Sequence, residues 1–229
     1  MALRSDAAMV LFYDIEGDSA DHDDWHSNEH FHERLSVPGF IRATRWVSTG
    51  SAPRYMVTYE VSGVDVATST AYLDRLNDPT PWTREMMPRF RGMIRGFCRV
   101  VESHGFGLGA AAAVLRFRPG EGADENLADW IRREVLPQLV RRPEVVGAHF
   151  LQPSPPPPMT REQSLRGADD PMSWLVLVTA FDGAALARAA AAHLDPAVFR
   201  ERGATAGTVL GEYALHHIAD EEEAARVRD

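Results

Sequence analysis

The sequence contains no lysine, and its 24 basic residues, all arginine, are outnumbered by 33 acidic ones, for a formal net charge of −9. This acidic balance argues against nucleic acid as a partner, because binding to phosphates requires a basic surface. The single cysteine, Cys98, excludes an intramolecular disulfide and is typical of a reducing cytoplasm. No apolar run approaches the roughly 20 residues of a membrane span, and no signal peptide is indicated. We expect a cytoplasmic globular protein without membrane or nucleic-acid partners.

The composition is sufficient for a buried core, since 45% of the 229 residues are hydrophobic and 25% are charged. From residue 9 to residue 101, apolar runs and helical segments alternate in the order β-α-β-β-α-β, the ferredoxin-like pattern. The predicted strands are 9–13, 40–48, 54–61 and 93–101, and the predicted helices are 23–37, 67–76 and 80–90.

The same order is predicted again in the second half of the chain. The Asp-Trp pair at 24–25 precedes Pro38 by the same spacing as the Asp-Trp pair at 129–130 precedes Pro143, which predicts a tandem repeat at an offset of 105 residues. The predicted strands here are 112–117, 144–151, 174–178 and 206–216, and the predicted helices are 125–140 and 184–202. The expected units are repeat one (1–104), repeat two (105–217), an exposed proline-rich insertion (152–170) and an acidic tail (218–229).

Each predicted half is an antiparallel sheet with helices on one face, so its other face needs a cover. Two such sheets packed face to face cover each other within one chain. The sequence therefore predicts an α+β protein, in which two tandem ferredoxin-like βαββαβ repeats form an intrachain pseudo-dimeric α/β barrel. A homodimer of the whole chain is left open.

A histidine-rich segment at residues 21–46 stands out in the first half. If it is helical, His22, His26 and His30 form one row, and Glu29 and Glu33 form a second row beside it. The aligned positions of the second half, 131 and 135, carry isoleucine and valine where His26 and His30 stand. The fold therefore does not require these histidines, which favours a functional role for them.

Three interpretations of this cluster compete. In general acid-base catalysis, His26 or His30 would move a proton, with Glu29 and Glu33 as orienting groups or second proton carriers. In a metal site, the H-x-x-E-H spacing of residues 26–30 would supply two ligands but would need a third from elsewhere, so we assign no metal. In the third interpretation the cluster is a solvated polar helix face.

Aromatic and basic residues on the predicted strands are candidates for ligand binding. Period-2 alternation places Phe40, Arg42, Thr44 and Trp46 on one face of strand 40–48, and Tyr55 and Tyr59 share a face of strand 54–61. If these faces line a cavity, an arginine there could hold an anionic group. The candidate substrate-binding residues are Trp25, Arg42, Trp46, Tyr55, Tyr59 and Arg95.

Several short motifs resemble the EthD-like branch of the dimeric α/β-barrel superfamily over residues 8–103. They are Asp24-Trp25, Glu29-His30, Glu33-Arg34, Val37-Pro38-Gly39-Phe40, Arg45-Trp46, Pro53-Arg54-Tyr55, Tyr72-Leu73, Asn77, Pro79-Thr80-Pro81-Trp82-Thr83 and Met87-Pro88-Arg89-Phe90-Arg91. The resemblance implies a ferredoxin-like barrel with a pocket beside or between its sheets, and it raises the rank of His30 and Glu29. Relatives of this kind include cofactor-independent monooxygenases, polyketide cyclases, lactone isomerases and haem-using proteins.

From these observations we expect a small-molecule enzyme that uses no cofactor and acts on an apolar, aromatic or polyketide-like substrate. Proton transfer by His26 or His30 would drive an isomerisation, cyclisation or elimination. Three alternatives stay open: a cofactor-independent monooxygenase at the same site, a non-catalytic ligand-binding or stress-associated barrel, and a haem- or metal-dependent enzyme.

Overall fold

Eight antiparallel strands close into a barrel in the computed structural model, which describes residues 3–50 and 53–226. Around the barrel the order is β1-β3-β2-β9-β5-β8-β6-β4, and pairing of β4 with β1 closes the ring. The predicted α+β barrel is confirmed. The strands are β1 (Ala7–Ile15), β2 (Phe40–Ser48), β3 (Tyr55–Val61), β4 (Phe90–Gly105), β5 (Ala111–Phe117), β6 (Val145–Pro153), β8 (Trp174–Ala180) and β9 (Val209–Asp220).

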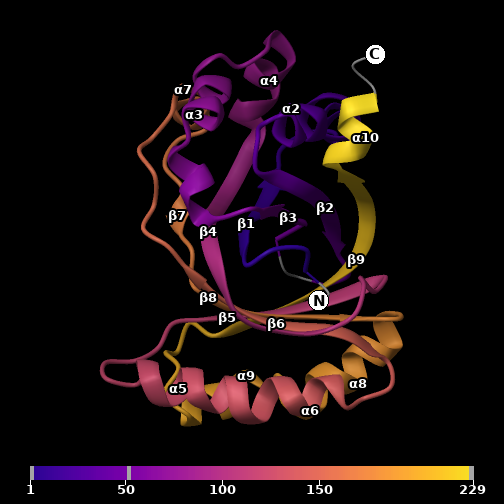
Figure 1. Cartoon of the computed structure of the whole chain (residues 1–229), viewed down its shortest axis with the longest axis vertical. Coiled ribbons are helices and arrows are strands. Elements are labelled where there is room, and N and C mark those ends of the chain that lie inside the picture. Colours follow the sequence, from indigo (N-terminus) through magenta and orange to yellow (C-terminus); the bar gives the residue numbers. More distant parts are fainter. Residues whose placement is uncertain (1–2, 51–52, 227–229) are drawn as a thin grey trace.

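Two layers of helices cover opposite outer faces of the barrel, as Figure 1 shows, with the first-half helices above it and the second-half helices below. The first layer comprises α1 (Ser19–Trp25), the π-helical turn η1 (His26–His30), α2 (Phe31–Leu35), the 3₁₀ turn η2 (Val64–Thr68), α3 (Thr70–Asn77), α4 (Pro81–Met86) and the 3₁₀ turn η3 (Met87–Arg89). The second comprises α5 (Asp124–Trp130), the π-helical turn η4 (Ile131–Val135), α6 (Leu136–Val140), α8 (Gly183–His193) and α9 (Pro196–Glu201).

The first helix begins at Ser19, earlier than the predicted residue 23. Asp18 caps it, because its carboxylate accepts a hydrogen bond from the backbone N–H of Ala20. The helix then widens into the π-helical turn η1, and the second half has the corresponding turn η4 exactly 105 residues later in the chain. Such turns often mark functional sites. Here the turn also occurs in the second half, whose corresponding helix carries no histidine, so it belongs to the fold.

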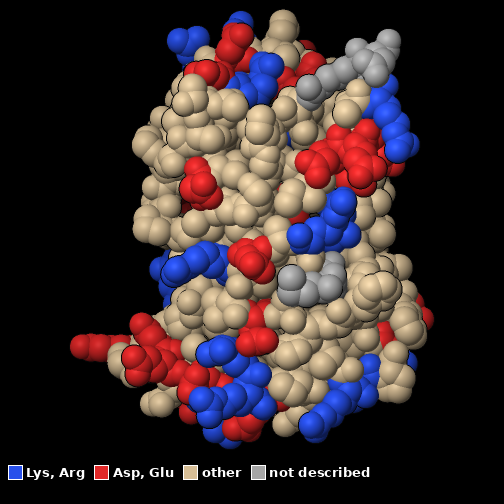
Figure 2. Space-filling model, in the orientation of Figure 1, with Lys and Arg blue, Asp and Glu red and all other residues tan. Residues whose placement is uncertain are grey.

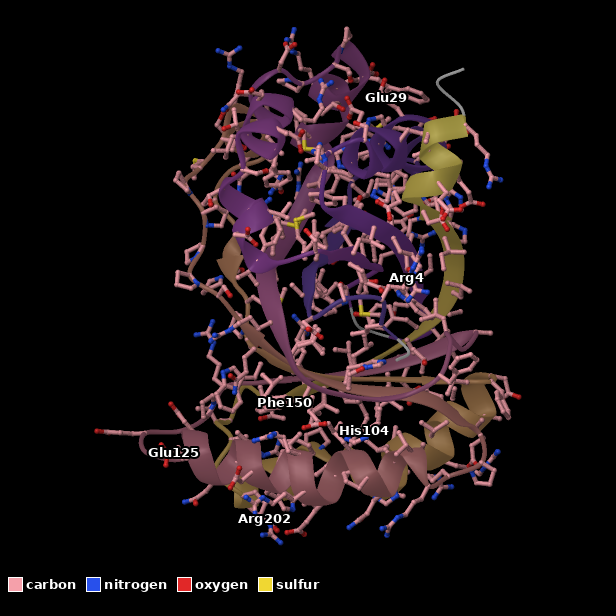
Figure 3. The ribbon with its side chains drawn as sticks, in the orientation of Figure 1. Arg4, Glu29, His104, Glu125, Phe150 and Arg202 are labelled. Carbon is pink, nitrogen blue, oxygen red and sulfur yellow. The ribbon has the colours of Figure 1, made fainter. Side chains whose placement is uncertain are left out.

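The hydrophobic core has three parts. One lies between the first-half helices and the outer face of the sheet, a second lies in the same place in the other half, and a third fills the inside of the barrel. Figure 3 shows Phe150 of the second part between sheet and helices. Phe12, Trp46 and Tyr213 belong to the third part and are all but fully buried. The first part, between helices and sheet, contains the histidine row.

One predicted strand face is wrong. The alternation of β2 placed Phe40 and Trp46 on the same face, but the pairing register with β3 shifts between Phe40 and Arg42. Phe40 consequently packs under the helices, whereas Trp46 points into the barrel. The predicted shared face of Tyr55 and Tyr59 is correct, since both lie in the helix-side core. A β-bulge reverses the alternation, and periodicity alone does not reveal it.

The proline-rich insertion forms a strap, defined here as residues 153–172, which runs along the first-half side of the barrel to α7 (Arg161–Ser164) (Figure 1). Its prolines at 155, 156 and 158 are exposed, as predicted, but Thr160, Glu162 and Gln163 are buried. The strap contacts α3 through α7 and pairs with β4 through the short strand β7 (Asp170–Pro171). The expectation of an exposed segment is therefore wrong for its second part.

The acidic tail predicted from residue 218 starts as the end of β9 and continues as α10 (Glu221–Arg226). Ala224 of α10 is buried in the helix-side core and α10 contacts α2. The glutamates of its first turn form the acidic patch beside α10 in Figure 2. Within residues 3–50 and 53–226, no helix has the length and apolar character to cross a membrane.

Candidate functional site

The histidine row faces the sheet and is buried. The helix formed by α1, η1 and α2 places His22, His26 and His30 against β1 and β3, with exposed fractions of 0%, 3% and 8%. The ring centroids of His22 and His26 are 5.2 Å apart, and those of His26 and His30 are 5.4 Å apart, so the imidazoles stack along the helix. Arg34, which is 2% exposed, extends the row by one more turn.

A narrow cavity of about 30 Å³, here called the histidine cavity, lies between this helix and strands β1, β3 and β4. That volume is about the space one water molecule takes up in liquid. The cavity is lined by three tyrosines, two histidines, three arginines, a glutamate and an apolar set: Tyr13, Tyr59, Tyr72, His26, His30, Arg34, Arg95, Arg166, Glu162, Met9, Leu11, Met87, Phe90 and Met93. It combines apolar walls with converging polar groups, as ligand sites do.

Arg45 fixes the protonation pattern of His26. Its Nη1 lies 3.2 Å from His26 Nδ1, and a guanidinium can only donate, so Nδ1 accepts and the ring proton is on Nε2. The hydroxyl of Tyr59 lies 3.4 Å from this Nε2. Burial, with the neighbouring His22, His30 and Arg45, lowers the pKa of His26 well below its usual value. His26 is therefore a neutral hydrogen-bond donor toward the cavity.

His30 has the opposite arrangement. Its Nδ1 lies 3.5 Å from Glu33 Oε2 and is buried without a hydrogen-bond partner among the described residues. A proton on this nitrogen, which faces the carboxylate, would leave the lone pair on Nε2. The ring packs on Trp25 with a centroid distance of 4.3 Å. Burial, followed by the charge of Arg34, lowers the pKa of His30 well below its usual value. His30 is thus an uncharged imidazole, and with its proton on Nδ1 it would present Nε2 as a basic nitrogen.

A third polar chain begins at Asp23. Its Oδ1 lies 3.1 Å from His22 Nδ1 and accepts a 2.9 Å hydrogen bond from the Tyr55 hydroxyl. His22 Nε2 is therefore left to accept from the hydroxyl of Tyr13, 3.1 Å away. Burial raises the pKa of Tyr13, which lines the cavity, well above its usual value. This chain keeps Tyr13 protonated and oriented.

Arg34 is held by a residue from the other half of the chain. Glu162, on α7 of the strap, accepts from Arg34 Nη2 with both carboxylate oxygens, at 2.5 and 2.6 Å. Burial alone would raise the pKa of Glu162, but the charge of Arg34 and its hydrogen bonds lower it below the usual value. Arg34 Nη1 is buried and has no hydrogen-bond partner among the residues of the described ranges. It is a free donor beside the histidines.

A second ion-pair group closes the cavity on the strap side. Asp169 accepts from Arg95 Nε at 3.0 Å, from Arg166 Nη2 at 2.8 Å and from Gln163 Nε2 at 3.1 Å. Arg95 Nη1 also donates to the hydroxyl of Tyr72 at 2.9 Å. The strap therefore contributes Glu162 and Arg166 to the wall of the histidine cavity, and Asp169 holds Arg95 and Arg166 in place.

Among the four predicted catalytic residues, His26 and His30 line the cavity and Glu33 adjoins His30. Glu29 lies elsewhere: its Oε1 accepts from Trp25 Nε1 at 3.2 Å and from Thr80 Oγ1 at 2.6 Å, at the start of α4. Figure 3 shows Glu29 among the helices at the top of the molecule. Of the two glutamates expected as orienting groups, Glu33 lies beside His30, at 3.5 Å from its Nδ1, and Glu29 is turned toward Thr80.

The predicted binding residues divide into three groups. Tyr59 and Arg95 line the cavity. Trp25 and Tyr55 lie in the core around the histidines without lining it. Trp46 and Arg42 lie away from the cavity. The Trp46 side chain is inside the barrel, and Arg42 pairs with Glu60 at 2.5 Å.

Several residues of the site are absent from the sequence-based expectations. Arg34 could have been found, because it follows His30 by four residues in the same helical row. Arg45 lies on a predicted strand, but the β-bulge between Phe40 and Arg42 decides on which face of the sheet its side chain lies, and the sequence does not reveal that bulge. Glu162, Arg166 and Asp169 belong to the strap, where composition indicated only exposed chain, and they carried no local signal.

The H-x-x-E-H spacing does not form a metal site here. The two nitrogens of His26 face Arg45 and Tyr59, and Glu29 is turned toward α4. Across residues 3–50 and 53–226, no group of three or more His, Cys, Asp or Glu side chains has an arrangement that could hold a metal ion.

Comparison with solved structures places the fold among known barrels. An anthrone oxidase-like protein superposes with a TM-score of 0.66 at 10% identity, over 95% of this chain and 94% of that one. A proposed monooxygenase of Fusobacterium nucleatum gives 0.60 at 8% identity over 95% and 96%, and another from Lactobacillus acidophilus gives 0.58 at 8% over 94% and 96%.

No protein-family profile matches the sequence, and no curated protein matches it. The EthD-like resemblance therefore has no support at the family level. At identities of 10% and below, the structural likeness shows a shared fold and does not show a shared function. This chain shares the closed α+β barrel fold of these solved structures.

Proposed function

We propose that the chain is a small-molecule enzyme that removes a proton from an apolar, aromatic or polyketide-like substrate, with His30 as general base. The different surroundings of His26 and His30 support this proposal, since Arg45 donates to Nδ1 of His26 whereas Nδ1 of His30 faces the Glu33 carboxylate at 3.5 Å. Two titratable groups whose surroundings assign them different roles are the usual mark of acid-base catalysis. We retain the EthD-like resemblance as part of this proposal.

In the proposed reaction, His30 Nε2 takes a proton from an acidic C–H or O–H of the substrate, and Glu33 stabilises the resulting imidazolium. Negative charge then develops on a substrate oxygen. His26 Nε2–H and the unpartnered Arg34 Nη1 can donate hydrogen bonds to that oxygen in a buried site. The enolate so formed leads to isomerisation, cyclisation or elimination and requires no cofactor.

A second candidate is oxygenation at the same site, favoured by the names of the proteins that share the fold. One is called anthrone oxidase-like and two are proposed monooxygenases. The first step would be the same proton removal. The carbanion would then react with molecular oxygen, so that a CH₂ group plus O₂ gives a carbonyl group plus water.

Both candidates predict base-catalysed exchange at an acidic C–H. Anthrone incubated anaerobically in D₂O should exchange its acidic methylene protons faster in the presence of the protein, as followed by NMR. His30→Ala should slow this exchange by about 10²–10⁴-fold, the contribution of a positioned base. Admission of air then separates the candidates, because only oxygenation consumes O₂ and yields the quinone.

The matched control is His193→Ala, which alters a histidine at the end of α8 in the second-half helix layer. It should leave the exchange rate unchanged. Folding of each variant is checked by circular dichroism. Exchange at the wild-type rate in a folded His30→Ala variant would refute the role of the base. An absence of exchange in the wild-type protein would refute the proposed substrate class.

A further inference from the structure

The histidine cavity is too small for an aromatic substrate, but a much larger cavity adjoins it. This strap cavity has a volume of about 500 Å³ and lies between β4 and the strap. Arg95 lines both cavities. The strap cavity is lined by Arg95, Gly96, Phe97, Pro153, Ser154, Pro155, Pro156, Pro157, Met159, Gln163, Ala168, Asp169, Asp170, Pro171 and Met172.

The strap is attached on both sides of this cavity. At one side, the backbone N–H of Ser154 donates to the carbonyl of Phe97 at 2.7 Å. At the other, β7 pairs with β4, and Met172 packs so closely on Gly96 that a Cβ at position 96 would lie 2.6 Å from Met172 Cβ. Between these attachments, the prolines at 155–158 cover the cavity and belong to no strand or helix. The cavity is thus held open by the backbone.

The lining is suited to a flat apolar molecule. Phe97, Met172 and five prolines supply most of it, and its polar residues are Arg95, Ser154, Gln163, Asp169 and Asp170. Beside the histidine cavity, Arg95 and Arg166 share the single carboxylate of Asp169. Glu162 is already paired with Arg34. At this boundary Arg34, Arg95 and Arg166 face Glu162 and Asp169, and the exposed Asp170 also lines the strap cavity. Arg95 is a cationic side chain that lines both cavities, which makes it the candidate partner for an anionic group on the ligand.

We propose that the strap cavity binds the body of the substrate, a flat aromatic molecule with one acidic oxygen that pairs with Arg95. The reactive carbon then enters the histidine cavity past Arg95 and Asp169, which form the partition between the two spaces. The link to catalysis rests on the proposed function. The binding itself does not, because it depends on the strap cavity alone.

Two matched probes test the binding by isothermal titration calorimetry. The anionic probe is 1-anilinonaphthalene-8-sulfonate, and the uncharged probe is N-phenyl-1-naphthylamine. We expect one saturable site for each. Ala168→Phe fills the cavity and should weaken both probes at least tenfold. Ala187→Phe, which alters another exposed alanine on α8, should change neither.

Arg95→Gln tests the charge preference. It should weaken the anionic probe by about tenfold, the loss of one charge-assisted hydrogen bond, and leave the uncharged probe unaffected. Deuterium exchange of the unaltered chain gives a readout that depends on no variant. Either probe should protect backbone amides of residues 154–172 and leave those of α8 unprotected.

Wild-type binding by a folded Ala168→Phe variant, or protection confined to other regions, would overturn the proposal. If Ala168→Phe has no effect on binding while His30→Ala abolishes proton exchange, the strap cavity is refuted and the proposed function stands. If Ala168→Phe abolishes binding while His30→Ala exchanges anthrone normally, the proposed base is refuted and the ligand site stands.

Discussion

Arg34 of α2 and Glu162 of α7 form a buried ion pair across the two halves of the chain, 128 positions apart in sequence. Their side chains are 3% and 5% exposed. Because both side chains are buried, water cannot replace either partner. The pair therefore attaches the strap to the helix formed by α1, η1 and α2.

Glu162→Gln should lower the free energy of unfolding by about 3–5 kcal/mol, because it leaves the Arg34 charge buried and unpaired. Urea denaturation monitored by circular dichroism measures the loss. The control is Glu222→Gln in the exposed pair with Arg226 on α10, which should cost less than about 0.5 kcal/mol. Equal effects of the two changes would mean that the strap does not depend on this pair.

Stability should fall on acidification from about pH 6.5, before the carboxylates titrate. Burial lowers the pKa of His26 and His30 in the folded protein, so the unfolded chain binds protons first as the pH falls. The contribution of the neutral histidines to the free energy of unfolding is complete above the unfolded-state pKa of about 6.5. Below that pH, each histidine that stays neutral in the folded protein lowers the free energy of unfolding by about 1.4 kcal/mol per pH unit. In a His26→Gln/His30→Gln double variant, the slope of unfolding free energy between pH 6.5 and 5 should be smaller; an unchanged slope contradicts the assignment.

The two histidines should be opposite tautomers at neutral pH. We expect His26 to carry its proton on Nε2 and His30 on Nδ1, because Arg45 faces one Nδ1 and Glu33 faces the other. Long-range ¹⁵N–¹H correlation spectra distinguish the tautomers directly. Arg45→Met should remove the preference of His26 and leave that of His30. Identical tautomers in the wild-type protein would remove the basis of the proposed acid-base roles.

Gly96→Ala should detach the strap from β4, since the added methyl group would lie 2.6 Å from Met172 Cβ. Overpacking of this kind costs about 1–3 kcal/mol. Limited proteolysis should then cleave the strap faster, and mass spectrometry of the fragments locates the cut. The control is Gly183→Ala at the first position of α8, where a Cβ would meet nothing within 4 Å. It should be neutral or stabilising by up to about 1 kcal/mol.

The barrel could be predicted from sequence because each strand carries its own local signal. The histidine row was also visible, since residues four apart on a helix share a face. The same order of elements in both halves, and the π-helical turns 105 residues apart, are what a tandem repeat would give, and the repeat itself stays a prediction.

The errors concern long-range contacts. His30 has one glutamate before it in sequence and another three residues after it, and only the packing of α4 decides that Glu29 turns to Thr80. Sequence could not place Glu162 or Asp169, because their partners Arg34 and Arg95 lie 128 and 74 positions away. Composition describes the strap as proline-rich, and its tertiary role comes from a few buried polar residues within it.

The covalent connection of the two halves allows them to differ. In a barrel built from two identical subunits, any residue that builds a site appears twice, and any loop that covers it does so too. Here the first half carries the histidines. The second half has apolar residues at those positions and carries the strap that covers the histidines. In a single chain, one half can therefore supply the reactive groups and the other half can supply their cover. A ligand would meet one site per barrel, with no identical neighbour to compete with or respond to it.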